Sequence, residues 1–275
     1  MKVDTVDVVI PNYGRTDQLR NAVLSAVNQD HPINNIWIID DGSDNSTKTF
    51  YESLIDEFSQ IRLVLMPHQG IPGYLRNLAL SLSSADFIAF LDSDDFWFTN
   101  KISRQINEMK AAKLEASCTN ALVFGPGTAS SVMHNFLDSS LDFRTIVGTN
   151  LVINSSLVVK RTRILELGGY PRDANLKSVE DYAFALRLSS REPICVIDEP
   201  LMIYSESIDS IRKDFVDVDA TSSALLDFLC WSVKAGHLRR RPLTLLRQVV
   251  HVALKVGKTL LKSHFVRVRA NEKPV

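Results

Sequence analysis

The stretch Phe87-Ile88-Ala89-Phe90-Leu91-Asp92-Ser93-Asp94-Asp95 leads from five apolar residues directly into an acidic cluster. A short apolar run of this kind is typical of a buried strand. Because alternate side chains of a strand point the same way, Asp92 and Asp94 share a direction, and the following turn can bring in Asp95. Clustered carboxylates repel one another unless positive charge lies between them. The stretch therefore predicts a strand that ends in a site for magnesium or manganese, although an isolated pattern this short is more often a solvated acidic turn.

Apolar runs and helical patterns alternate on the N-terminal side of this stretch. Alternation at this spacing indicates a parallel sheet with helices on both faces. Ligands of such sheets bind beyond the carboxyl ends of the strands. Buried strands are expected at Val6–Pro11, Asn35–Asp40, Ile61–Met66 and Asp86–Leu91, with helices at Thr16–Gln29, from Ser46 or Thr47 to about Phe58, and at Ile71–Ser83.

Conspicuous polar groups follow these strands, where a ligand would bind. Asn12 and Tyr13 come after the first strand, and Asp40 and Asp41 end the second. A carboxylate at a strand end can accept a hydrogen bond from the N3–H of a uracil or a similar base, and Gly42 permits the tight turn that follows. The alternative is a turn that caps a helix and binds nothing.

The second half of the chain is less regular. Ala116–Phe124 and Asn154–Lys160 are expected to be strands, and Val179–Ser189 is expected to be a helix that opens with Glu180-Asp181. Acidic residues are common in the first turn of any helix, so this pair alone is weak evidence of a site. Further elements are predicted at Lys101–Ala112, Arg161–Leu167, Ile194–Ile197 and Leu201–Ser205, and the pattern is helical from Val218.

Charge is distributed unevenly along an otherwise ordinary globular composition. The 275 residues are 45% hydrophobic and 23% charged, with a formal net charge of -1. This balance excludes a disordered, collagen-like or disulfide-stapled chain. From Lys234 to Val275, however, eleven Lys and Arg face one acid, Glu272, which leaves 20 basic and 31 acidic residues in the rest. We expect a domain at residues 1–215 and a basic helical extension at 216–275.

The extension has the pattern of a basic amphipathic helix. Within residues 237–269, apolar side chains can share one side of a helix while most basic ones lie elsewhere. Such a helix can lie on an anionic membrane surface. It can equally pack on its own domain with a solvated basic side, or form a dimer contact. Nucleic-acid binding is not expected, because the body is acidic and no aromatic residues are interleaved with the basic ones.

The cysteines and the N-terminus point to a reducing compartment. Cys118, Cys195 and Cys230 show neither zinc-binding nor disulfide-framework spacing. Residues 1–7 contain two acids and lack the apolar region of a signal peptide, and no window is apolar enough for a membrane span. The expected location is the cytoplasm, with the basic extension giving a possible peripheral contact with the inner face of the cell membrane.

Five motifs in order resemble glycosyltransferase family 2 over about residues 3–210. They are Val8-Val9-Ile10-Pro11-Asn12-Tyr13, Ile38-Ile39-Asp40-Asp41-Gly42-Ser43, Gly70-Ile71-Pro72-Gly73-Tyr74-Leu75-Arg76-Asn77, Phe90-Leu91-Asp92-Ser93-Asp94-Asp95 and Glu180-Asp181. The resemblance implies the GT-A fold, a Rossmann-like α/β architecture with a mostly parallel central sheet and helices on both faces, here followed by the C-terminal helical extension.

The resemblance also implies roles for particular residues. Asp181 matches the general base of the family, and Asp94 and Asp95 match or extend its metal-binding acids. Arg76 matches a basic residue near the donor, and Asp92 lies where the donor ribose and the metal are held. The implied donor-nucleotide site comprises Pro11, Asn12, Tyr13, Arg15, Asp40, Asp41, Arg76, Asp92 and Ser93.

The expected activity is therefore inverting, metal-dependent transfer of one sugar from a nucleotide sugar, with UDP the commonest nucleotide of the family. A growing glycan or a lipid-linked saccharide of a bacterial cell-surface polysaccharide is the expected acceptor. The Q-x-x-R-W signature of processive synthases is absent after Asp181, which favours single transfers, and Tyr13-Gly14 replaces the usual Tyr-Asn. The alternatives are a nucleotidyltransferase and a non-catalytic nucleotide-sugar-binding or scaffolding protein.

Overall fold

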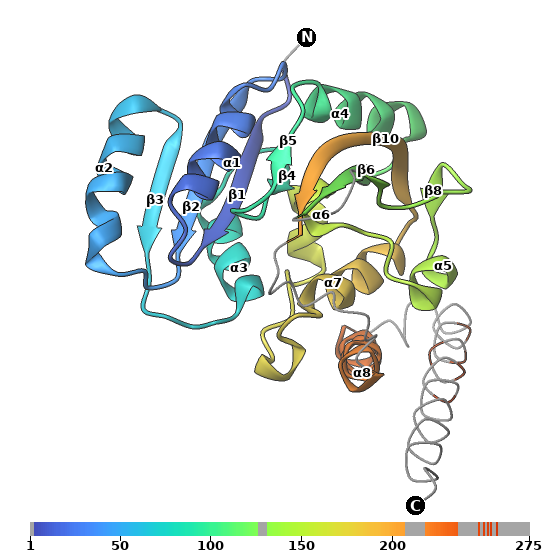
Figure 1. Cartoon of the computed structure of the whole chain (residues 1–275). Helices are drawn as coiled ribbons and strands as arrows, with labels where there is room; N and C mark the ends of the chain where they lie inside the picture. Colours follow the sequence, from blue (N-terminus) through green and yellow to red (C-terminus); the bar gives the residue numbers. More distant parts are fainter. Residues whose placement is uncertain are drawn as a thin grey trace, which may run out of the picture.

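One ten-stranded sheet organises the computed structural model, which describes residues 3–125, 131–206 and 218–235 and five helical positions at 247, 250, 252, 254 and 257 (Figure 1). Eight strands form the path β3-β2-β1-β4-β9-β6-β10-β5, and β7 and β8 pair with β6 and β10. The strands are β1 (Val6–Asn12), β2 (Ile33–Asp40), β3 (Ile61–Leu65), β4 (Phe87–Phe90), β5 (Phe96–Trp97), β6 (Ala116–Phe124), β7 (Ser131–Val132), β8 (Ser140–Leu141), β9 (Val158–Lys160) and β10 (Ile194–Ser205).

The N-terminal half of the sheet is parallel, and the C-terminal half is mixed. Strands β3, β2, β1 and β4 run parallel, and β9 pairs antiparallel with both β4 and β6. Because β9 is antiparallel to both of its neighbours, β6 runs in the same direction as β4. Strand β6 and its parallel partner β10 therefore end at the same edge as β1, β2 and β4. The predicted α/β sheet is confirmed, and its carboxyl ends gather polar residues from both halves of the chain.

Helices cover both faces, as the sequence predicts. On β1, Val9 packs in one core cluster with α3, α7 and α8, while Val8 and Ile10 pack in the other with α1, α2 and α4. This alternation follows from the period of two along a strand. The helices are α1 (Asp17–Val27), α2 (Lys48–Glu57), α3 (Pro72–Leu82), α4 (Lys101–Ala112), α5 (Phe143–Gly148), α6 (Arg161–Glu166), α7 (Glu180–Ser189) and α8 (Val218–Lys234), with 3₁₀ turns η1 (Asn45–Thr47), η2 (Asn154–Ser156) and η3 (Ala174–Leu176).

Two segments of the second half differ from the prediction. Ile194–Ser205 is one strand. Pro200 has no N–H to donate to the neighbouring strand, and shifts in the pairing register on either side of it let the strand continue. The expected strand at Asn154–Lys160 is a strand only from Val158, and its first three residues form η2.

The start of the predicted extension packs on the domain. On α8, the ring of Phe228 lies 4.8 Å from that of Phe143, and the indole of Trp231 donates to the Leu167 carbonyl at 3.0 Å. The predicted boundary between residues 215 and 216 stays a prediction, but α8 belongs physically to the core. The amphipathic segment 237–269 lies mostly outside the described residues. Over the part of the chain that is described, no helix combines the length and apolar character needed to cross a bilayer.

Candidate active site

The ends of β1 and β2 form one side of the site. Asn12 and Asp40 are register partners, and the backbone N–H of Asp41 donates to the Asn12 carbonyl at 2.8 Å. The Asn12 amide is buried and donates to the Tyr51 hydroxyl at 2.9 Å and to the Arg15 carbonyl at 3.0 Å. Asn12 thus holds the loop that follows β1, and the two predicted strand ends meet.

Asp40 is occupied by the protein itself. Its carboxylate accepts from the Ser43 N–H at 2.9 Å and from the hydroxyls of Ser43 and Tyr51. Burial and the bond to Asp40 raise the pKa of Tyr51 to about 12, so this hydroxyl keeps its proton and acts as a donor. The observed contacts give Asp40 a role in shaping the turn, and its place in the donor-nucleotide site stays a prediction.

Asp41 joins β2 to the segment that leads into α3. Its carboxylate accepts from the backbone N–H groups of Gln69 and Gly70 at 2.7 and 2.8 Å. The ring of His68, next in the same segment, lies 4.5 Å from that of Tyr13, which is 55% exposed. Pro11, part of β1, is half-buried beneath this loop. An exposed aromatic pair beside a fixed carboxylate offers a planar surface and a hydrogen-bond acceptor to a base.

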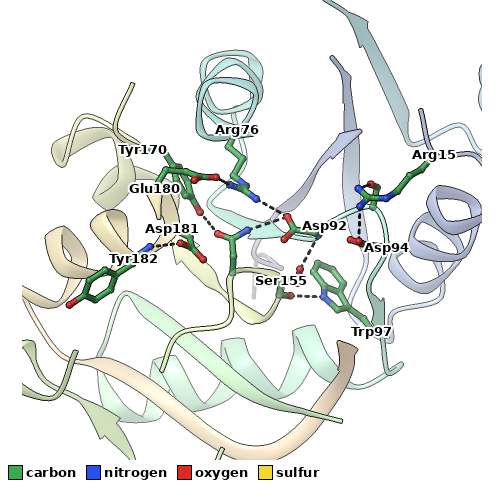
Figure 2. A network of polar contacts seen from close by, with 12 residues as sticks. Arg15, Arg76, Asp92, Asp94, Trp97, Ser155, Tyr170, Glu180, Asp181 and Tyr182 are labelled. Atoms are coloured by element: carbon green, nitrogen blue, oxygen red, sulfur yellow. Dashed lines mark hydrogen bonds and ion pairs between the residues drawn. The ribbon is translucent and has the colours of Figure 1, made fainter. Parts of the chain in front are cut away.

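Arg15 bridges the first loop to the acidic segment. Its guanidinium lies 2.8 Å from the Asp94 carboxylate and donates to the hydroxyl of buried Ser93 at 3.2 Å (Figure 2). Burial raises the pKa of Asp94, the charge of Arg15 opposes that rise, and the nearby Asp92 adds to it. The sequence predicted that Arg15 lies near the donor, and in the structure Arg15 contacts the acidic segment at Asp94 and Ser93.

Arg76 connects the acidic segment to α7. Its buried guanidinium contacts Asp92 at 2.7 Å and Glu180 at 3.2 Å (Figure 2). It also lies over the Tyr170 ring, 5.2 Å from the centroid. Burial alone would lower the pKa of Arg76, but the neighbouring acids outweigh it and the pKa is raised. A permanent positive charge therefore sits between two carboxylates from distant parts of the chain.

Asp95 lies behind the other acids. Its side chain is 3% exposed and accepts from the Ser205 N–H at 2.9 Å. Burial raises its pKa well above the ordinary value, and repulsion from Asp92 and Asp94 contributes. Asp92 and Asp94 are more open, with side chains 34% and 21% exposed.

The donor set fits a divalent cation that takes one or two protein ligands. The mutual repulsion of three carboxylates is what a hard cation would relieve. Over the described residues, however, no group of three or more acidic, histidine or cysteine side chains is placed to hold a metal ion. Magnesium and manganese commonly complete their coordination with phosphate oxygens and water. Metal binding by Asp94 and Asp95 stays a prediction.

Asp181 lies in the first turn of α7. Its carboxylate accepts from the Tyr182 N–H at 2.6 Å, and its side chain is only partly exposed (Figure 2). Burial, followed by repulsion from Glu180, raises the pKa of Asp181 to about 7, while Arg76 opposes the rise. A carboxyl group that titrates near neutrality can accept a proton at working pH, which suits a general base.

Several residues of this network carried no signal strong enough to find from sequence. Glu180 was noticed only as the neighbour of Asp181, yet its Oε1 binds Arg76 and its Oε2 is buried without a partner in the structure. Asn154 bonds the Tyr170 hydroxyl at 2.7 Å. With its amide oxygen turned towards Arg76, Asn154 accepts from that guanidinium at 3.1 and 3.3 Å. The sequence did not single out Asn154, because it lay in an expected strand. It did not single out Tyr170, which follows Gly168-Gly169, because it lay in an expected turn.

Comparisons with known proteins identify the family of the chain. Residues 7–167 match the model of the family described as "Glycosyl transferase family 2". The chain is 28% identical to an uncharacterized glycosyltransferase of Haemophilus influenzae over 186 residues, 68% of this chain and 72% of that one. It is 27% identical over 191 residues to WfaP of Escherichia coli, a UDP-Glc:alpha-D-GlcNAc-diphosphoundecaprenol beta-1,3-glucosyltransferase, with 69% and 72% covered.

A solved structure shows the same fold. The crystal structure of S. aureus TarS 1-349 in complex with UDP-GlcNAc superimposes with a TM-score of 0.67 at 16% identity. The superposition covers 83% of this chain and 66% of the TarS fragment, so the chain spans slightly less than two thirds of that fragment. At this identity the likeness concerns the architecture alone.

Proposed function

The chain is a glycosyltransferase of family 2, and on that premise we propose that it transfers one sugar, with inversion, from a UDP-sugar to a glycan acceptor. The observation that carries the proposal is the charge network at the carboxyl ends of the strands, where Arg15 pairs with Asp94 and Arg76 joins Asp92 to Glu180, the neighbour of Asp181. Family membership favours this reaction over the nucleotidyltransferase and scaffolding alternatives.

The nucleotide is proposed to bind between the loop that follows β1 and the loop that follows β2. The rings of Tyr13 and His68 would pack against the base, and the Asp41 carboxylate would accept a hydrogen bond from an N–H group of the base. Pro11 and Asn12 form the strand end beneath, and Asp40 keeps the turn in place through Ser43 and Tyr51. Uracil fits this chemistry because it presents an N3–H to a carboxylate. UDP-sugars are the donors named for WfaP and for the TarS complex, which supports the same choice here.

Asp94 and Asp95 would hold magnesium or manganese, with Asp92 and Ser93 facing the donor. When bound, the cation would neutralise the charge that develops on the leaving nucleoside diphosphate. Asp94 is the more open of the two acids, and Arg15 fixes its position. Arg76 adds a second positive charge at Asp92 and orients that carboxylate.

Asp181 is the proposed general base. An inverting transfer needs a carboxylate on the acceptor side to take the hydroxyl proton as the acceptor oxygen attacks the anomeric carbon. The pKa of about 7 keeps a substantial fraction of Asp181 ionised at neutral pH and makes it a stronger base than an ordinary carboxylate. Without the processive signature, each encounter would add one sugar.

The proposed acceptor belongs to a bacterial cell-surface polysaccharide and is lipid-linked, as the acceptor named for WfaP is. The enzyme would then work in the cytoplasm at the inner face of the membrane. The basic tail supports this arrangement, and Arg247, Val250 and Leu254 are exposed helical positions three and four residues apart. Side chains at this spacing lie on one side of a helix and combine charge with apolar surface.

A thermal-shift titration tests the donor and the cation together. Purified full-length protein is heated with UDP, GDP, dTDP or CMP, each with manganese or with EDTA. Ligand that binds only the folded state raises the melting temperature by mass action. We expect a manganese-dependent rise with UDP that exceeds the others. A larger rise with another nucleotide would contradict the UDP assignment, and an equal rise in EDTA would contradict the metal site.

A further inference from the structure

A turn of three buried polar residues supports the acidic segment from below. The exposed fractions of Asn154, Ser155 and Ser156, which form η2, are 7%, 1% and 0%. Their backbone continues into β9, and the Phe90 N–H at the end of β4 donates to the Leu157 carbonyl at 3.1 Å. Buried polar groups are costly unless hydrogen-bonded, so the partners of this turn define what it does.

Ser155 makes two hydrogen bonds to this part of the chain, one from Asp92 and one from Trp97. Its hydroxyl accepts from the Asp92 N–H at 3.0 Å. Its carbonyl accepts from the Trp97 indole at 2.7 Å (Figure 2). The same hydroxyl keeps a proton to donate, and its influence on Asp95 opposes the rise in the pKa of that carboxyl. Ser155 thereby ties η2 to the backbone at Asp92 and to the side chain of Trp97.

The turn is itself fixed from α4. The Ser156 carbonyl accepts from Gln105 Nε2 at 2.8 Å and from Lys101 Nζ at 3.2 Å. Lys101 is fully buried, donates to Gln105 Oε1 at 2.6 Å and lies 4.2 Å from the centre of the Trp97 ring. These contacts restrict the turn through buried groups of α4 and involve no residue of the proposed nucleotide site.

We propose that Ser155 is a positioning residue that sets the geometry of Asp92–Asp95, an inference that rests on the proposed function of those acids. Between β4 and β5 the acidic segment has no strand ladder of its own, and its carboxylates must face different partners: Arg76, Arg15 and the Ser205 amide. Binding and catalytic groups need to be held to within about 0.5 Å. Ser155 supplies that restraint from the opposite half of the sheet.

Hydrogen exchange tests the restraint without any ligand. In the full-length protein, Ser155→Ala removes the acceptor of the Asp92 N–H, so exchange of the peptide spanning residues 91–97 should accelerate roughly tenfold. Ser156→Ala is the matched control, because its hydroxyl bonds the Ile153 carbonyl within the same turn. Unchanged exchange in Ser155→Ala, or equal acceleration in Ser156→Ala, would overturn the proposal. If Ser155→Ala does not fold, Trp97→Phe removes the donor to the Ser155 carbonyl, together with part of the buried ring, and should accelerate the same peptide.

Titration with UDP and manganese then tests the consequence for the site. We expect the Kd of UDP in manganese to rise about tenfold in Ser155→Ala and to keep its wild-type value in Ser156→Ala. Faster exchange with unchanged UDP affinity would overturn the positioning role. Failure of the wild-type protein to bind UDP would instead contradict the proposed donor, and the exchange experiment would still decide whether Ser155 holds the segment.

Discussion

With its pKa raised to about 7, the carboxyl group of Asp181 is about half protonated at neutral pH. It lies where the acceptor hydroxyl is proposed to lose its proton. Its amide replacement, Asp181→Asn, keeps the size of the side chain but cannot accept that proton. We expect transfer to fall by about 10²–10⁴-fold, the usual contribution of general-base catalysis, while UDP binding is retained. The measurement is kcat with donor saturating, beside the Kd of UDP. Persistence of transfer in this variant would remove Asp181 from the mechanism.

The same substitution has a predictable effect on stability. The pKa of Asp181 is raised to about 7 by burial and by Glu180, so the folded state favours the protonated carboxyl. Stability from this group is complete at pH below about 4 and is lost as pH rises through 7. Asp181→Asn should therefore raise the melting temperature relative to wild type at pH 8 and change it less at pH 5. The reverse order would contradict the raised pKa.

Glu180 is expected to set the pH range in which Asp181, as the proposed base, accepts a proton. Its negative charge is the second cause, after burial, of the raised pKa of Asp181. Replacing Glu180 with Gln removes that repulsion, so the acidic limb of the kcat–pH profile, expected near pH 7, should move to lower pH. Glu166→Gln is the control, since Glu166 is exposed and pairs with Arg163 on α6. An unmoved limb in Glu180→Gln would show that another group controls the profile.

At the scale of elements, the turn after β2 depends on a glycine. Gly42 has φ +81°, and a Cβ there would lie 2.7 Å from the backbone nitrogen of His68. Gly14 also has positive φ, +67°, but no atom within 4 Å of its Cβ position. Gly14→Ala therefore carries only the backbone penalty of about 1–2 kcal/mol, or a few degrees in melting temperature.

Gly42→Ala should cost more than this control and should also weaken UDP binding, because moving His68 displaces the Gln69 and Gly70 amides that hold Asp41. Thermal unfolding and UDP titration of the two variants check this. Equal melting temperatures and equal UDP affinities would mean that the chain yields at His68 without effect on the site.

The elements that could be predicted are those whose pattern is local. Ala116–Phe124 and Lys101–Ala112 coincide with β6 and α4, and the strands before Asp41 and Asp92 were found because apolar runs end there in turn residues. Strands β5, β7 and β8 have two residues each and exist through their partners, so no period marks them.

The same distinction applies to the site. Motifs pointed to Asp92 and Asp181, but not to the contacts that surround them. Asn154 and Ser155 are buried because Tyr170, Trp97 and the acidic segment provide hydrogen bonds from elsewhere in the sequence. A polar triplet before an apolar run reads locally as the start of a strand, and only the tertiary structure shows it as a turn beneath the acids.

At the scale of the whole molecule, α8 is part of the domain's core. Phe228 is fully buried against Phe143, and Asp227 pairs with Arg187 of α7 at 2.7 Å. Phe228→Ala should lower the stability of the entire domain by about 3–5 kcal/mol in a single transition. Leu226→Ala, at a position 53% exposed, should change stability by no more than about 0.5 kcal/mol. Two separate transitions in the wild-type protein would instead support an independent extension.

The uneven charge of the chain leads to the last prediction, which concerns the membrane. If the tail binds anionic lipid, each basic residue near the surface contributes about 1 kcal/mol, and the attraction weakens as salt shortens the Debye length. Replacing Arg239, Arg240 and Arg241 with Gln should reduce binding to phosphatidylglycerol vesicles about 100-fold at low salt. The matched control replaces Lys48, Arg62 and Lys113, three exposed basic residues of the domain, and should bind as wild type does.

Co-sedimentation at 50 and 500 mM salt measures both effects, with neutral phosphatidylcholine vesicles as the reference surface. Equal loss in the two triple variants would mean that net charge, rather than the tail, drives binding. Binding that ignores both salt and the arginines would indicate an apolar contact. Absence of wild-type binding would favour the other use of a basic helix, in which the tail packs on its own domain and the enzyme reaches its acceptor without a membrane contact of its own.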